Sequence, residues 1–198
     1  MKKDRYSIKF YKGCRLLTDF YLDKFYNPKI VGRENLPDSG YLLVGNHKSG
    51  LDILLVAYAL RKYNPRFMAK KEFFENPILK WLFEKVGAFP IDRQSLDLTA
   101  VKKAIRLLKD NNIVVIFPEG TRNTKEEMLP FKKGVASISM ISNSKVVPFG
   151  ISGDYKFRSK PTIEFGKAID FKEESIGKEE ADNYLQEKVK NLIRNNSR

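Results

Sequence analysis

One histidine and one aspartate are spaced so that they could act together on a proton. His47 follows an apolar segment, and Asp52 stands five positions later at the start of a helical pattern. Inside a single helix this spacing would set the two side chains about 140° apart. Across a turn, the carboxylate can instead reach back to one ring nitrogen and leave the other nitrogen free as a base. The alternative is a helix-capping aspartate beside a structural histidine, and the pair alone leaves both open.

Cationic side chains follow other apolar segments. Lys70 and Arg93 each come directly or shortly after one, and a third such segment ends at Pro118. The loop beyond it offers backbone and side-chain donors that suit a phosphate, and its residues are Glu119, Gly120, Thr121 and Arg122. Each cation alone is more simply a solvated surface charge. Their repeated position predicts that they gather at the carboxyl edge of a sheet.

Short apolar runs alternate with helical patterns along most of the chain, which is the rhythm of βαβ units. We expect strands at 41–45, 66–69, 88–91, 113–117, 145–151 and 162–165, and helices at 52–62, 76–86, 96–109, 132–142 and 178–194. The predicted fold is a single α/β domain over residues 28–198. Its mixed, mostly parallel sheet is flanked by helices.

Residues 1–27 are predicted to form an amphipathic, membrane-associating segment. Phe10, Cys14, Leu17 and Tyr21 recur at spacings of three and four, with basic residues between them. This stripe could pack on the core or lie in a lipid interface, and both could hold for different faces. The longest purely apolar run, 53–60, is far shorter than the ~20 residues of a transmembrane helix. Membrane attachment would therefore be peripheral or monotopic.

The net charge and the motifs that are absent limit the classes of partner and cofactor that the sequence predicts. The chain carries 37 basic and 24 acidic residues, a net charge of +13, which favours anionic lipid or nucleic acid. The excess is spread over both halves, and no nucleic-acid-binding motif is present, so a nucleic-acid module is the weaker alternative. One cysteine and one histidine cannot build a Cys- or His-rich metal site. The absence of phosphate-loop and dinucleotide fingerprints argues against an ATPase, a kinase or a dinucleotide enzyme.

Four blocks of the sequence resemble, in order, the motifs of the glycerolipid acyltransferases, a family that includes lysophosphatidic acid acyltransferase. They are NHKSGLD at 46–52, GAFPIDR at 87–93, FPEGTR at 117–122 and VPFGI at 147–151. The family patterns that they resemble are N-H-x₄-D, G-x-x-F-I-x-R, F-P-E-G-T-R and V-P-x-x-I. The resemblance covers roughly residues 30–170. It departs at Asn123, where many members have Ser, and at Pro90-Ile91 in the second block.

The resemblance implies a glycerol-3-phosphate acyltransferase-like fold and an acyl transfer. The acyl group would move from acyl-CoA or acyl-carrier protein to the hydroxyl of lysophosphatidic acid or a related acceptor, at the cytoplasmic side of a membrane. No metal or other cofactor is expected. His47 would be the general base and Asp52 its partner, and the acceptor phosphate would be bound by Lys70, Arg93, Glu119, Gly120, Thr121 and Arg122. A hydrolase that uses the same pair to activate water is the alternative.

Overall fold

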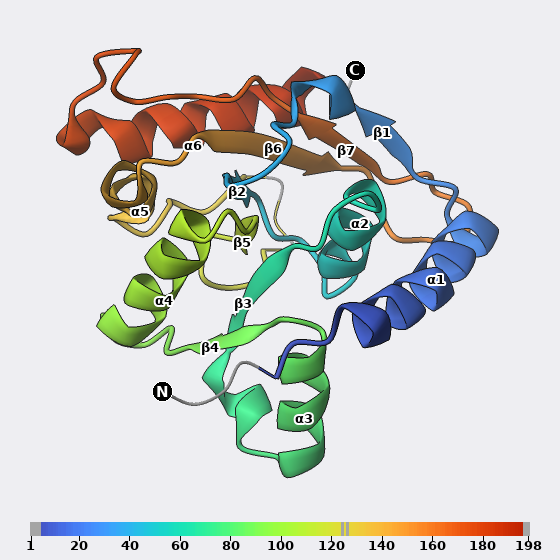
Figure 1. Ribbon diagram of the computed structural model, residues 1–198. Helices are drawn as coiled ribbons and strands as arrows, with labels where there is room; N and C mark the ends of the chain where they lie inside the picture. The colour runs from blue at the N-terminus through green and yellow to red at the C-terminus, as the bar shows by residue number, and fades with distance from the viewer. Residues whose placement is uncertain (1–4, 124, 126, 196–198) are drawn as a thin grey trace.

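A seven-stranded sheet forms the centre of the computed structural model, which describes residues 5–123, 125 and 127–195 (Figure 1). The strands are β1 (Lys29–Val31), β2 (Leu42–Gly45), β3 (Arg66–Lys70), β4 (Phe89–Ile91), β5 (Val114–Ile116), β6 (Val146–Ser152) and β7 (Thr162–Phe165). Their order across the sheet is β1-β7-β6-β2-β5-β3-β4. β6 and β7 pair antiparallel, and the other neighbouring strands pair parallel. The predicted mixed, mostly parallel α/β sheet is confirmed.

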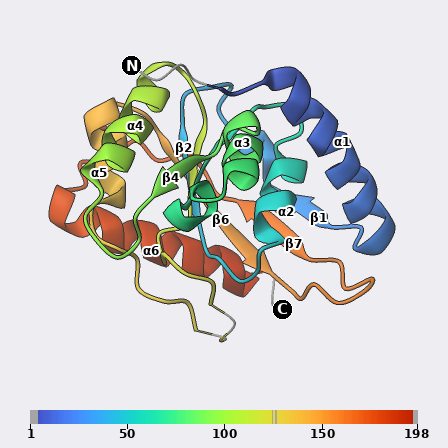
Figure 2. The ribbon, with the colours of Figure 1, turned by 90° about the horizontal axis from the view of Figure 1, so that it is seen from below.

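Helices cover both faces of this sheet. They are α1 (Ile8–Phe25), α2 (Asp52–Ala59), α3 (Pro77–Lys85), α4 (Leu98–Lys109), α5 (Val135–Ser142) and α6 (Lys178–Asn195), with short 3₁₀ helices at Arg33–Asn35 and Lys71–Phe74. One apolar cluster joins the sheet to α4, α5 and α6, and a second joins the opposite face to α2. Figures 1 and 2 show α4, α5 and α6 on one side of the molecule and α1 and α2 on the other.

β2 lies in the middle of the sheet, between β5 and β6, and all four of its residues are buried. Leu42 and Val44 face the cluster under α4–α6, and Leu43 faces the cluster under α2. A parallel strand covered on both faces has no polar side, which explains its continuous apolar run. The turn that follows β2 is therefore enclosed by two neighbouring strands.

The structure departs from the predicted elements mainly at their ends and in the shortest ones. The helix predicted at 52–62 ends at Ala59, because tight turns close at Tyr63 before β3 begins. β1 was not predicted, since it has three residues and none is buried. Some positions of the predicted segments 1–27 and 28–198 lie outside the described residues. They are residues 1–4, 124, 126 and 196–198.

Helix α1 packs on α2 through a face that the sequence did not identify. Its buried residues are Tyr11 and Leu22, whereas Leu17, part of the predicted stripe, is 72% exposed. Leu22 forms an apolar cluster with Tyr58 of α2. One face of α1 thus belongs to the core and another is open. Among the described residues, no helix has the length and hydrophobicity to span a bilayer.

Candidate active site

The chain is locked to β6 immediately before His47. At Gly45 a Cβ would stand 2.5 Å from the Phe149 ring and from its carbonyl oxygen, so this close approach requires glycine. The next residue, Asn46, accepts a hydrogen bond from the Ile151 N–H at 2.7 Å and donates to the Ile151 carbonyl at 2.9 Å. These paired bonds fix the direction in which the chain enters the turn.

His47 and Asp52 meet across this turn. His47 Nδ1 lies 2.8 Å from Asp52 Oδ2, with the two side chains 5% and 0% exposed. The same oxygen accepts the N–H groups of Lys48 at 2.6 Å and Ser49 at 2.7 Å. Since the carboxylate accepts these bonds, Nδ1 carries its proton toward Asp52 and Nε2 keeps a free lone pair. The Asp52 carboxylate thus contacts the ring and holds the turn before α2. It does not cap that helix, whose N-cap is Leu51 with no side-chain capping bond.

The loop after β5 holds the backbone of His47 from two sides. Glu119 Oε1 accepts the His47 N–H at 2.8 Å, and the Asn123 N–H donates to the His47 carbonyl at 2.7 Å. Glu119 Oε2 accepts the Leu129 N–H at 3.0 Å. Burial raises the pKa of Glu119, and the N–H groups of His47 and Leu129 oppose that shift. Both carboxylate oxygens are engaged by the protein, an arrangement that differs from the phosphate contact implied by the resemblance.

Phe117 supports the imidazole ring. The two rings stack at a centroid distance of 4.4 Å and an interplanar angle of 25°. Phe117 in turn packs edge-to-face on Phe149 of β6 at 5.8 Å. The ring of His47 is thus held by stacking on one side and by Asp52 at Nδ1.

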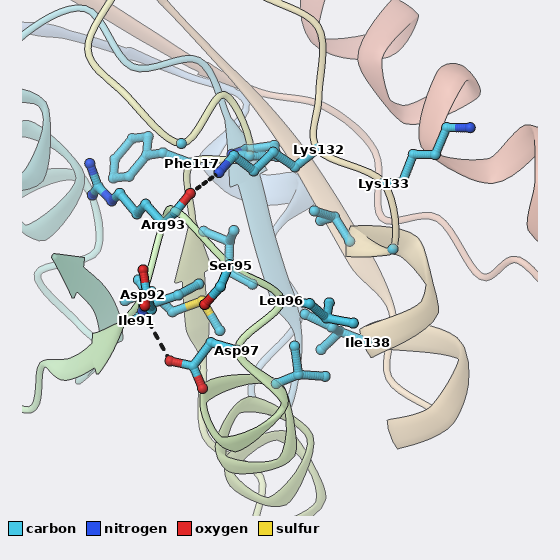
Figure 3. Close-up of a pocket in the computed structure, with 17 residues that line it drawn as sticks. Ile91, Asp92, Arg93, Ser95, Leu96, Asp97, Phe117, Lys132, Lys133 and Ile138 are labelled. Atoms are coloured by element: carbon cyan, nitrogen blue, oxygen red, sulfur yellow. Dashed lines mark hydrogen bonds between the residues drawn. The ribbon is translucent and has the colours of Figure 1, made fainter. Parts of the chain in front are cut away.

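A mainly apolar cavity of about 130 Å³ opens beside Phe117 (Figure 3). Met68, Val101, Ile116 and Ile138 are among the residues that line it. Figure 3 shows Arg93 and Lys132 next to Phe117, where the Lys132 ammonium donates to the Arg93 carbonyl, while Lys133 points away. Lys132 is a candidate that the sequence reasoning missed, although the Lys132-Lys133 pair before a helix could have drawn attention to it.

The Arg122 guanidinium lies at the turn, and the Arg93 guanidinium interacts with it electrostatically. Arg122 Nη1 lies 3.8 Å from the point that a Cβ on Gly50 would occupy, so Arg122 reaches the turn between His47 and Asp52. Burial lowers the pKa of Arg93; Glu72 opposes this shift and Arg122 adds to it. Two cations that interact in this way are suited to bind an anion.

The other predicted phosphate contacts are placed differently. Gly120 lines the cavity in a left-handed conformation, with φ at 72°. Thr121 is exposed on the same loop. Lys70, the last residue of β3, is exposed, and its ammonium lies 3.1 Å from Glu72. β5, β3 and β4 are neighbours, so all these residues share one edge of the sheet as predicted, but Lys70 is engaged by Glu72.

Tyr155 is a further residue near the pair, and no sequence pattern pointed to it. It follows β6, and its hydroxyl donates to Asp52 Oδ1 at 2.7 Å. The two residues are 103 positions apart, so no local spacing links them.

Comparison with known proteins gives a consistent set of similarities. A family model described as "Acyltransferase" matches residues 27–152. The 1-acyl-sn-glycerol-3-phosphate acyltransferase of Bacillus subtilis is 33% identical over 144 residues, which are 72% of this chain and 71% of that protein. The enzyme of the same name from Streptococcus pneumoniae is 32% identical over 139 residues, 67% of this chain and 51% of that protein. The crystal structure of the 1-acyl-sn-glycerophosphate (LPA) acyltransferase PlsC from Thermotoga maritima has a TM-score of 0.75 and 25% identity, over 96% of this chain and 79% of that one.

Proposed function

This chain belongs to the acyltransferase family, and from that premise we propose that it acylates the free hydroxyl of lysophosphatidic acid or a related glycerophospholipid, using an acyl thioester as donor. The observation that carries the proposal is the His47–Asp52 pair with the Arg122 guanidinium beside it. A base and an anion-binding group at the same turn suit a hydroxyl and a phosphate on one small molecule.

The proposed reaction begins at the free nitrogen of the imidazole. His47 Nε2 accepts the proton of the acceptor hydroxyl as its oxygen attacks the thioester carbonyl carbon. The tetrahedral intermediate then collapses, the carbon–sulfur bond breaks, and the leaving thiolate takes the proton from the imidazolium. Asp52 stabilises that imidazolium through the 2.8 Å contact at Nδ1. The new ester bond forms and the thioester bond breaks without a covalent acyl-enzyme intermediate.

The surroundings of the pair supply binding groups for both substrates. Arg122 and Arg93 can hold the acceptor phosphate, and anchoring one end of a small molecule raises the effective concentration of its hydroxyl at the base. The apolar cavity beside Phe117 suits the acyl chain of the donor.

Product analysis tests the function directly. The purified protein is incubated with acyl-CoA or acyl-carrier protein and with lysophosphatidic acid, glycerol 3-phosphate or lysophosphatidylcholine, and products are identified by mass spectrometry. Phosphatidic acid formed only when thioester is present is the expected result. Free fatty acid as the sole product would contradict the proposal and favour the hydrolase.

Arg122→Ala should raise the acceptor KM for lysophosphatidic acid roughly 10- to 100-fold, since a charge-assisted hydrogen bond contributes about 1.5–3 kcal/mol. The kcat should change little, because the lost contact is made in the ground state as well. Steady-state kinetics with saturating donor measure both constants. Monoacylglycerol, which lacks the phosphate, is the matched control and should be used equally by the two proteins. A lower kcat at unchanged KM would mean instead that Arg122 stabilises the transition state and not the bound substrate.

The proposed acceptor resides in a bilayer, so we also propose peripheral attachment to the cytoplasmic face of a membrane. Solvent-exposed apolar side chains support the proposed membrane attachment. Leu17 of α1 is 72% exposed, and Ile78 and Trp81 of α3 are 76% and 47% exposed. Phe10 of α1 packs edge-to-face on Trp81 at 5.3 Å, which joins the two helices into one surface. Basic residues near anionic lipid contribute about 1 kcal/mol each.

Trp81 is the only tryptophan, so its fluorescence reports on α3 alone. Adding phosphatidylglycerol vesicles should shift its emission to shorter wavelength, and brominated lipid should quench it, because the indole enters a less polar layer. Phosphatidylcholine vesicles are the control and should give a smaller shift, in keeping with the net charge of +13. Co-sedimentation without a spectral shift would show that the protein binds the vesicles but that α3 does not contact the lipid. Failure to co-sediment with either vesicle would contradict membrane attachment.

A further inference from the structure

The Asp52 carboxylate is held at both oxygens, but by different parts of the chain. Oδ2 accepts from His47 and from two backbone N–H groups of the same turn. Oδ1 accepts the Tyr155 hydroxyl at 2.7 Å. The first three donors lie within five residues of Asp52, whereas Tyr155 comes from the segment between β6 and β7.

Holding the second oxygen has a geometric consequence. The torsion that rotates an aspartate carboxylate has a broad energy profile, so the hydrogen-bond partners of its two oxygens decide where its plane lies. The Tyr155 hydroxyl at Oδ1 adds a constraint from a distant part of the chain to the three contacts at Oδ2, and so helps to set the direction from Oδ2 to His47 Nδ1. The orientation of the imidazole, and therefore of Nε2, depends on that direction.

We infer that Tyr155 is a positioning residue for the acyl transfer, which orients His47 through Asp52. This inference rests on the proposed function for its kinetic consequence, but its geometric part does not. Tyr155 does not exchange a proton with the substrate in this scheme. Its hydroxyl keeps the base in the orientation that the reaction requires.

The hydroxyl is suited to act as a permanent donor. Burial raises the pKa of Tyr155 well above its usual value, and the neighbouring Asp52 carboxylate raises it further, both by its charge and by its hydrogen bond. The phenol therefore keeps its proton throughout the pH range in which enzymes work.

The end of α1 holds the segment that carries Tyr155. The Tyr155 ring packs edge-to-face on Tyr26 at 5.9 Å. The Phe157 ring contacts Phe25 at 6.1 Å, and the Arg158 N–H donates to the Phe25 carbonyl at 2.8 Å. Helix α1, whose other face is open, is thus connected to Asp52 through one aromatic side chain.

The test compares two tyrosine hydroxyls that are alike in chemistry. Tyr155→Phe removes the hydroxyl and keeps the ring. Tyr58→Phe is the matched control. Tyr58 lies in α2, the helix that begins at Asp52, and its hydroxyl donates a 2.6 Å hydrogen bond to Asp23. Misplacement of a catalytic group costs up to about 10²-fold. Three contacts at Asp52 Oδ2 stay in place, so Tyr155→Phe should lower kcat about 10-fold with the acceptor KM within about twofold. Tyr58→Phe should leave both constants near wild type.

A second measurement needs no substrate. His47 is the only histidine, so ¹⁵N-histidine labelling gives one imidazole whose Nδ1 proton, bonded to Asp52, is observed directly by NMR. Tyr155→Phe should shift or broaden this resonance, and Tyr58→Phe should not. If Tyr155→Phe matches Tyr58→Phe in both kcat and spectrum, the inference is wrong. If the wild type shows no transfer activity, the proposed function fails, while the spectrum still decides whether Tyr155 orients the ring.

Discussion

His47→Ala is expected to lower thioester-dependent acylation of lysophosphatidic acid by about 10²- to 10⁴-fold, the usual contribution of a general base. No second imidazole is present to take over, since His47 is the only histidine in the chain. The acceptor KM should change little, because the phosphate contacts proposed for Arg122 and Arg93 do not involve His47. Initial rates with saturating donor, followed by product mass spectrometry, measure the effect.

The controls for this variant separate lost chemistry from lost structure. The ring stacks on Phe117 at 4.4 Å, so alanine leaves a space that free imidazole can enter. Activity that returns as imidazole is added would show that a base is what the variant lacks. Thermal unfolding of the variant without substrate monitors the fold. Turnover near that of the wild type in a folded variant would reject His47 as the base.

The main elements of the fold could be predicted because the buried strands are local signals. β2 and β5 have only buried residues, and their apolar runs stand out between polar turns. β1 could not be predicted in the same way, since its three residues are partly exposed and it is defined by pairing with β7. The buried face of α1 was also missed, because aromatic and aliphatic residues occur on more than one side of that helix.

In the candidate site, too, contacts between neighbours in the sequence could be predicted and contacts between distant residues could not. His47 and Asp52 are five residues apart, so a turn was enough to bring them together in the prediction. The bonds from Asn46 to Ile151 and from Tyr155 to Asp52 span 105 and 103 residues, and only the folded sheet makes them. Glu119 was selected from its motif, but residue type does not reveal which way a carboxylate points.

Glu119→Gln should impair both the fold and the reaction, although it changes the side chain very little. Glu119 accepts two backbone N–H groups, from His47 and Leu129, through its two separate oxygens. Glutamine has one oxygen, so its amide nitrogen would face one of these N–H groups inside a buried site. An unsatisfied buried donor costs about 1–3 kcal/mol, and we expect a loss of this size in the free energy of unfolding. Because the His47 backbone is released, kcat should fall about 10-fold or more.

Glu127→Gln is the matched control, since Glu127 is exposed on the same loop and the substitution is chemically identical. Denaturant unfolding of both variants in the absence of substrate gives the stability term, and steady-state kinetics give kcat and the acceptor KM separately. The control should resemble the wild type in all three. If Glu119→Gln instead kept its stability and its kcat and altered only the acceptor KM, Glu119 would be an acceptor contact, as the sequence resemblance implied. The two oxygens facing backbone N–H groups favour the first result, because a carboxylate already engaged in this way is not available to a phosphate and would repel it.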